Sequence, residues 1–124
     1  MDQRGRQESL HVDDVEFLAE QDGVPERELK EALRPVLLGH APAKRAYLAV
    51  IRYSGDPDHH VALCLASELN SDVKTLVREC ADVFVSLFRS DIHLDTILVN
   101  GVQELRLKNV CWPFFDRDKE NVQV

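Results

Sequence analysis

Residues 45–66 are RAYLAVIRYSGDPDHHVALCLA, and this stretch decides the fold class. Its two apolar runs, residues 46–51 and 61–66, flank the turn-forming sequence Ser-Gly-Asp-Pro-Asp at residues 54–58. Short apolar runs rich in aromatic and β-branched side chains, bounded by Gly, Pro and Asp, predict a strand, a loop and a second strand. Both faces of each run are apolar, which is typical of central strands covered by helices. We therefore expect a β-hairpin at the centre of a sheet.

Two amphipathic helices are predicted, one on each side of the hairpin in sequence. Residues 25–38 begin with a proline, which suits the first helical position, and acidic side chains follow it. The apolar stripe of this helix consists of Leu29, Ala32, Leu33, Val36 and Leu37. Residues 71–88 follow a capping sequence at residues 70–72 and keep one apolar stripe over four turns. That stripe consists of Val73, Leu76, Val77, Cys80, Phe84, Leu87 and Phe88.

The remaining segments predict two strands and leave one alternative open. Residues 15–20 favour a strand, although the same residues tolerate a helix. Residues 91–99 alternate between two faces and predict a strand with one wetter face. Asn100-Gly101 between apolar segments is a strong hairpin signal, whereas the apolar spacing of residues 102–109 suits a short helix.

These elements combine into an α+β fold. We expect a two-layer sandwich with a mixed or antiparallel sheet in β-α-β-β-α-β order plus a short C-terminal helix, an order found in ferredoxin-like split βαβ units. The strands are expected at residues 15–20, 45–53, 60–67 and 91–99, and the helices at 25–38 and 71–88. Residues 1–14 are expected to be a flexible tail, 15–117 a single domain and 118–124 a mobile tail. The side chains expected to share the core are Leu33, Leu48, Val50, Leu63, Leu65, Val77 and Phe84.

The composition restricts the class of protein. With 124 residues and 44% hydrophobic content, the chain can bury one core. The net charge of −7 disfavours nucleic-acid binding, which requires clustered Lys and Arg. The sequence shows neither a signal-peptide pattern nor an apolar run as long as the roughly 18 residues of a membrane span, so no membrane association is expected. Three widely spaced cysteines without a C-x-x-C motif are typical of reduced thiols, and the expected location is cytoplasmic.

The hairpin loop contains four potential metal ligands, Asp56, Asp58, His59 and His60. Adjacent histidines at the entry of a strand point to opposite faces, so both cannot readily reach one ion, and structural zinc requires four converging ligands. We therefore interpret the loop as a polar turn. We expect no metal or cofactor, and no effect of Zn²⁺, Ni²⁺ or Ca²⁺ on the melting temperature.

Known motifs for nucleophilic, nucleotide-dependent and metal-dependent catalysis do not occur in the sequence. His93 and Asp95 lie two residues apart on one face of a predicted strand and form a potential acid–base pair. Cys111 is a potential nucleophile, although a small buried hydrophobe is its more ordinary interpretation. A small enzyme that uses His93 and Asp95, or Cys111, is therefore the alternative function, and no catalytic residue is assigned.

Residues 112–117, Trp-Pro-Phe-Phe-Asp-Arg, hold much of the aromatic content of the chain. Pro113 restricts the backbone, and a stiff aromatic segment loses little entropy when it docks. We expect the segment to pack over the helix at residues 71–88 or over a sheet edge and to bury Trp112; docking onto another chain is the alternative. The candidate interaction residues are Trp112, Phe114, Phe115 and Arg117.

Three segments carry a resemblance to a known family: LKEALRPVL at residues 29–37, RAYLA at 45–49 and the terminal WPFFDR. In this order they resemble the C-terminal domain of the enhanced serine sensitivity protein SseB family, over residues 15–117. Phe115 stands where that family usually has a tyrosine. The resemblance favours the short helix after Asn100. It implies no established enzymatic activity, cofactor or catalytic residue, so the expected function is a non-catalytic interaction or regulatory module that binds a protein partner or a second copy of the chain.

Overall fold

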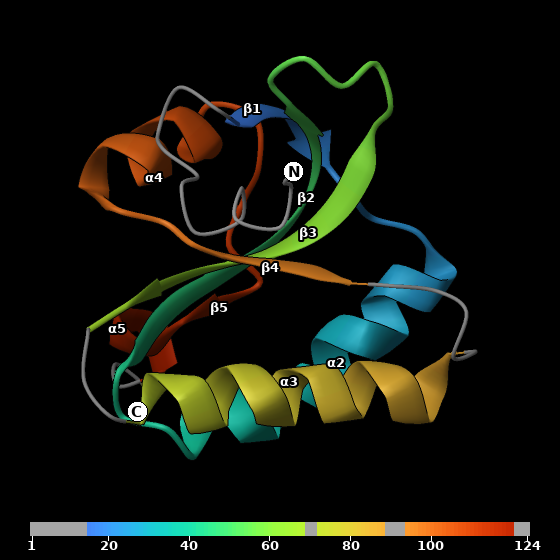
Figure 1. Ribbon diagram of the computed structural model, residues 1–124. Helices are drawn as coiled ribbons and strands as arrows, with labels where there is room; N and C mark the ends of the chain where they lie inside the picture. The colour runs from blue at the N-terminus through green and yellow to red at the C-terminus, as the bar shows by residue number, and fades with distance from the viewer. Residues whose placement is uncertain (1–14, 69–71, 89–93, 121–124) are drawn as a thin grey trace.

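A mixed sheet organises the structure, a computed structural model in which residues 15–68, 72–88 and 94–120 are described (Figure 1). The strands are β1 (Val15–Glu20), β2 (Ala43–Tyr53), β3 (His60–Ser67), β4 (Asp95–Leu98) and β5 (Phe115–Asp116). The first four lie in the order β1-β2-β3-β4, with β4 parallel to β3 and the other neighbours antiparallel. β5 pairs with β2 on the edge that β1 also occupies, because β3 takes the opposite edge.

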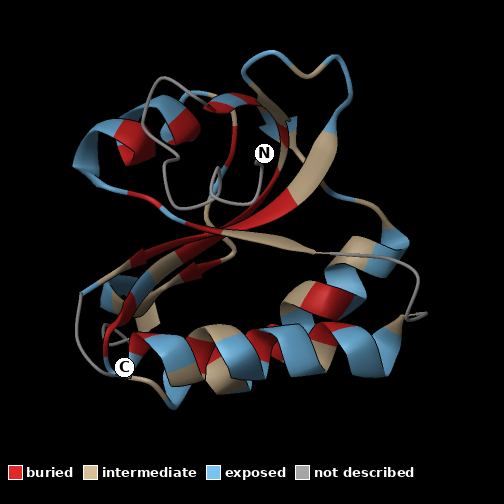
Figure 2. Ribbon diagram, viewed as in Figure 1, coloured by how far each residue is buried: buried red, intermediate tan, exposed pale blue. Residues whose placement is uncertain are grey.

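The central hairpin is confirmed by β2 and β3. β3 covers the expected residues, and β2 begins earlier than expected, at Ala43. Residues 46–49 are buried whichever face of β2 they occupy, as Figure 2 shows for the middle of the sheet. Gly55 turns the loop with a φ of 83°, a conformation that side chains with a Cβ rarely adopt. The apolar residues at alternate positions of this run therefore belong to a strand that is buried on both of its faces.

Two long helices, α2 (Val24–Leu38) and α3 (Val73–Leu87), cover one face of the sheet (Figure 1). Their apolar stripes pack against inward side chains of β2 and β3. The cluster consists of Leu29, Leu33, Leu37, Ala43, Ala46, Leu48, Leu63, Leu65, Leu76, Cys80, Phe84 and Phe115. Because α3 carries the chain back along the sheet, β4 can run parallel to β3.

The short helix α4 (Gly101–Lys108) lies on the opposite face of the sheet. Its start is fixed by a capping box, in which Asn100 Oδ1 accepts from Gln103 N at 2.8 Å and Gln103 Oε1 accepts from Asn100 N at 2.9 Å. Leu107 is buried on the sheet in a second cluster, which also contains Tyr47 and Cys64. A helix, rather than a hairpin, therefore follows Asn100.

The α+β class, the mixed sheet and the order of elements are confirmed. The pairing of the strands differs from that of a split βαβ unit. In such a unit the strands that flank the helix run parallel with another strand between them, but β1 and β2 are antiparallel neighbours. Gln21 N donates to the carbonyl of Leu48 at 3.0 Å, so the chain stays attached to the edge of β2 until it leaves for α2. The order of elements along a chain does not determine which strands pair.

Most of the expected core is confirmed. Leu33, Leu48, Leu63, Leu65 and Phe84 are buried in the cluster under α2 and α3. Val77 is half-buried against that cluster, and Val50 is half-buried as well. Val50 pairs with Val61, which is also half-buried, so the helices cover this end of the hairpin less completely.

Two elements begin later than predicted, α3 at Val73 and β4 at Asp95. Residues 1–14, expected to be a flexible tail, lie outside the described residues, as do 69–71, 89–93 and 121–124. Within the described part of the chain, no helix has the length and apolar character needed to cross a membrane.

Candidate functional site

The aromatic segment at residues 112–117 attaches to the edge of β2 (Figure 1). Phe114 N donates to the carbonyl of Ala46 at 2.9 Å, and β5 continues the pairing. Phe115 is only 1% exposed and lies in the cluster under α2 and α3, and Phe114 packs against the same cluster. The segment therefore docks on its own domain, at a sheet edge.

Arg117 joins this segment to the C-terminal end of α2. Its Nε donates to the carbonyl of Ala43 at 2.7 Å, and its Nη2 donates to the carbonyls of Leu37 at 2.7 Å and His40 at 3.0 Å. A cation at this position also interacts favourably with the negative end of the helix dipole. The guanidinium therefore binds three carbonyls in the turn between α2 and β2.

Arg34 reaches the same segment from the middle of α2. Its Nη1 donates to the carbonyl of Phe114 at 2.9 Å, and its Nη2 pairs with Glu120 Oε2 at 2.5 Å. Glu120 belongs to α5 (Arg117–Glu120), a single turn that follows β5. Residues 118–124 are predicted to be a mobile tail, and residues 117–120 of the structure form a helical turn. The ion pair with Arg34 and the contacts of Arg117 attach the two ends of this turn to the domain. Residues 121–124 lie outside the described residues.

Trp112 is the residue of this segment that remains on the surface, with 77% of its area exposed. The expectation that it is buried is wrong. Its backbone N contacts Glu20 Oε1 at 3.4 Å, while the backbone on either side is fixed, Cys111 N to the carbonyl of Leu107 and Phe114 N to that of Ala46, each at 2.9 Å. The two phenylalanines take the available space against the core, and the indole projects from an anchored backbone.

A comparison with known protein families assigns the chain to a family. The profile of the SseB protein C-terminal domain matches residues 18–117. The chain belongs to this family. Comparisons with curated proteins and with solved structures give no match.

Two of the three segments that carry the SseB resemblance, RAYLA at residues 45–49 and the terminal WPFFDR, are neighbours in space. Ala46 pairs with Phe115, and Arg45 pairs with Asp116. The guanidinium carbons of Arg34 and Arg117 lie 6.0 and 5.5 Å from the ring centroid of Phe115. The terminal SseB motif therefore closes the domain around β2, and Arg117, a candidate interaction residue, makes its described contacts within its own chain.

A buried polar cluster lies beneath α4, and no sequence pattern predicted it. Glu104 is 8% exposed and accepts from Arg45 Nε at 2.5 Å, from Arg45 Nη2 at 3.0 Å and from the hydroxyl of Tyr47 at 2.5 Å. The Arg45 guanidinium lowers the pKa of the Glu104 carboxyl, although burial opposes it. Burial, together with the hydrogen bond to Glu104, raises the pKa of Tyr47. An ionised carboxylate with satisfied partners holds α4 to β2 of the SseB domain.

Cys111 does not have the environment of a nucleophile. It is buried, and burial raises the pKa of its thiol to about 12. Its Sγ lies 3.5 Å from the carbonyl of Leu48. A thiol in this state is protonated at neutral pH and unreactive. The geometry therefore favours the interpretation of Cys111 as a small core side chain.

The other candidate pair and the hairpin loop also form internal contacts. His93 lies outside the described residues, and Asp95 Oδ2 accepts from the hydroxyl of Tyr53 at 2.8 Å. His60 Nε2 lies 3.0 Å from Asp56 Oδ2, whereas His59 is exposed. Among the residues that the structure describes, no three His, Cys, Asp or Glu side chains converge as metal ligands.

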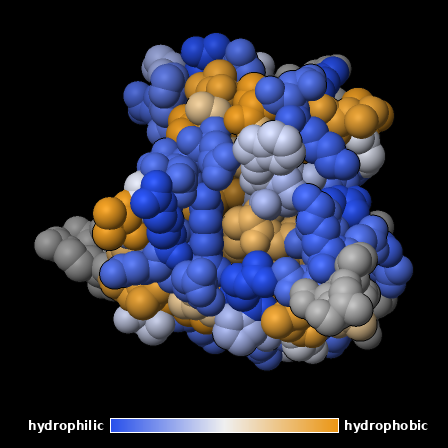
Figure 3. All heavy atoms as spheres, turned by 180° about the vertical axis from the view of Figure 1, so that it is seen from behind, coloured by the Kyte–Doolittle hydropathy of each residue, from blue (hydrophilic) through white to orange (hydrophobic). Residues whose placement is uncertain are grey.

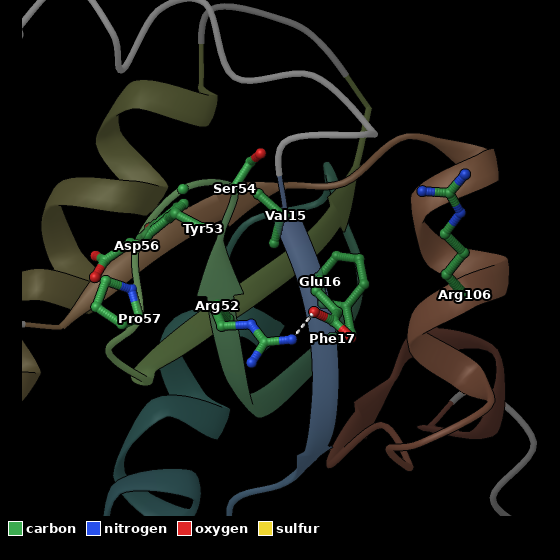
Figure 4. A pocket seen from close by; sticks show the side chains of 10 residues that line it. Val15, Glu16, Phe17, Arg52, Tyr53, Ser54, Asp56, Pro57 and Arg106 are labelled. Atoms are coloured by element: carbon green, nitrogen blue, oxygen red, sulfur yellow. Dashed lines mark hydrogen bonds and ion pairs between the residues drawn. The ribbon is translucent and has the colours of Figure 1, made fainter.

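An open cavity of about 700 Å³ lies between β1, the hairpin loop and α4 (Figure 4). Arg52 crosses to Glu16, with Nη2 and Oε1 2.5 Å apart, and Arg106 of α4 lies on the far side in the view. The lining residues are Val15, Glu16, Phe17, Arg52, Tyr53, Ser54, Gly55, Asp56, Pro57 and Arg106. Neither Asp95 nor Cys111 lines the cavity, so it does not contain these candidate catalytic groups.

Proposed function

We propose that this SseB-type domain is a non-catalytic interaction or regulatory module of the cytoplasm, and that Trp112 is its principal contact residue. The observation that carries the proposal is the exposure of Trp112 on a backbone fixed at Cys111 and Phe114. Tryptophan is enriched among the residues that dominate binding energy at protein interfaces. A side chain presented by a rigid backbone also loses less entropy on binding.

The distribution of exposed apolar residues supports a contact of limited size. α4, which leads into this segment, exposes Val102 and Leu105. On the face shown in Figure 3, apolar residues form separate patches among polar ones rather than one continuous area. Such a surface is typical of a protein whose partner binds and dissociates, rather than of a subunit in a permanent oligomer.

The expected location rests on the cysteines. Cys64, Cys80 and Cys111 are free and buried, and burial raises the pKa of each thiol to about 12. Free thiols in a domain without disulfides are typical of a reducing compartment.

The net charge of −7 supports a protein partner rather than nucleic acid.

The test compares the wild-type chain with Trp112→Ala and with Val85→Ala, a matched truncation of an exposed apolar side chain on α3. Sedimentation over a range of concentrations measures self-association, and capture from cytosolic extract, followed by titration of the purified partner, measures binding to another protein. Trp112→Ala is expected to weaken the affinity about 30-fold or more, the effect of a contact worth about 2 kcal/mol. Val85→Ala is expected to have no such effect. A monomer that captures no partner, or an affinity unaffected by Trp112→Ala, would rule the proposal out.

A further inference from the structure

His40 lies in the turn between α2 and β2, and its ring faces two carboxylates of the α3 segment. Nδ1 is 3.3 Å from Asp72 Oδ2, and Nε2 is 3.0 Å from Glu79 Oε1. The His40 side chain is only 11% exposed. The ring therefore bridges the turn to the first two turns of α3.

These two contacts require a proton. A neutral imidazole carries one N–H and can donate to one of the carboxylates only, whereas the imidazolium donates to both. We propose that His40 is a proton-controlled clamp, which holds the start of α3 against the α2–β2 turn when the ring is charged and releases one contact when it is neutral.

The two carboxylates that face the ring favour the clamped form. The hydrogen bond that the ring donates to Glu79 raises the pKa of His40, burial opposes this effect, and the contact with Asp72 raises the pKa further. From the C-terminal segment, Arg117 contacts the backbone carbonyl of His40. At the start of β2, Lys44 binds Glu68 at 3.2 Å.

Release would act on the beginning of α3. Asp72 is the N-cap residue of α3, yet its side chain makes no capping hydrogen bond and is directed to His40 instead. A raised pKa in the folded state means that the clamp stabilises fully below the unfolded pKa of about 6.5 and is lost as the pH rises through the folded pKa. The clamp would therefore couple the attachment of α3 to pH in the range just above that value.

The first experiment is an NMR titration of the His40 ring in the full chain. The midpoint is expected above the ordinary histidine value, and Glu79→Gln is expected to lower it more than Asp72→Asn does, because Glu79 is the larger cause. A midpoint at or below the ordinary value, or one unchanged by Glu79→Gln, would overturn the proposal.

The second experiment measures the urea midpoint at about pH 6 and about pH 9, which lie on either side of the expected titration. The wild-type midpoint is expected to fall over this range, and His40→Gln is expected to remove part of that fall. The matched control is His59→Gln, an exposed histidine in the hairpin loop, which should keep the wild-type fall. An equal fall in wild type and His40→Gln would show that the contact does not stabilise α3.

Discussion

Arg117 lies over the ring of Phe115, with its Cζ 5.5 Å from the ring centroid. The same guanidinium binds the carbonyls of Leu37, His40 and Ala43. One side chain at the end of the domain therefore secures a buried aromatic ring and the exit of α2. This relationship explains why the terminal motif stabilises the fold even though it stands far from α2 in sequence.

Replacing Arg117 is expected to destabilise the domain. Arg117→Ala should lower the free energy of unfolding by about 2–4 kcal/mol, since hydrogen bonds to charged groups contribute about 1.5–3 kcal/mol and a cation–π contact about 0.5–1. Arg117→Lys should recover less than half of the loss, because an ammonium cannot reproduce the planar fork. Urea unfolding measures both. Lys119→Ala, an exposed residue of the same turn, is the control, and an equal effect at both positions would contradict this role.

The sequence predicted the elements whose pattern is local. Residues 60–67 carry an apolar run bounded by turn residues, and β3 has these bounds. The choice between hairpin and helix after Asn100 stayed open, although Asn100 and Gln103 have the spacing of a capping box and contain the signal that decides it. Period and caps are local properties, so the sequence contains them.

Contacts between distant segments were not predictable in the same way. Arg45 and Tyr47 share a face of β2 by alternation, and Glu104 shares a face of α4 with Leu107, but no spacing shows that these two faces meet. The prediction that Trp112 is buried was wrong for a related reason. Its aromatic character predicts burial, whereas the space against the core is taken by Phe115, a fact that depends on the register of β5.

Glu104 is expected to give the domain a measurable pH dependence in acid. Because Arg45 lowers the folded-state pKa of Glu104 below its ordinary value of about 4.5, its contribution is present above that value and is lost as the pH falls through the folded pKa. Glu104→Gln should cost about 1–3 kcal/mol at neutral pH, where a buried charge loses its partner, and should remove part of the acid loss.

The control for Glu104 is Glu16→Gln, which removes the partner of Arg52 at an exposed position of β1. Exposed ion pairs contribute about 0–1 kcal/mol, so this variant should remain near wild type. Chemical unfolding from neutral pH to about pH 3 compares the three proteins. Equal pH profiles for wild type and Glu104→Gln would mean that the carboxylate does not stabilise the attachment of α4.

Two residues that the sequence assigns to the same core are expected to differ in how much they contribute to the free energy of unfolding. Leu63 is fully buried on β3, and Leu63→Ala should cost about 2–5 kcal/mol. Val77 is half-buried on α3, and Val77→Ala should cost only about 1 kcal/mol. Thermal melts measure both. If Val77→Ala destabilised the domain as much as Leu63→Ala, α3 would have to lie closer to the sheet than the structure places it.

Trp112 is the single tryptophan of the chain, so tryptophan fluorescence reports on this residue alone. Because the indole is exposed, emission of the folded protein at low concentration should resemble that of the unfolded protein, and iodide should quench both to a similar extent. Trp112→Ala should change the free energy of unfolding by less than about 0.5 kcal/mol, whereas Phe115→Ala should cost about 3–5 kcal/mol. A blue shift at every concentration would show that Trp112 is buried in its own domain and would contradict the structure. A blue shift that appears only as the concentration rises, and together with a larger sedimenting species, would instead show that a second copy covers the indole, which identifies the partner as the chain itself.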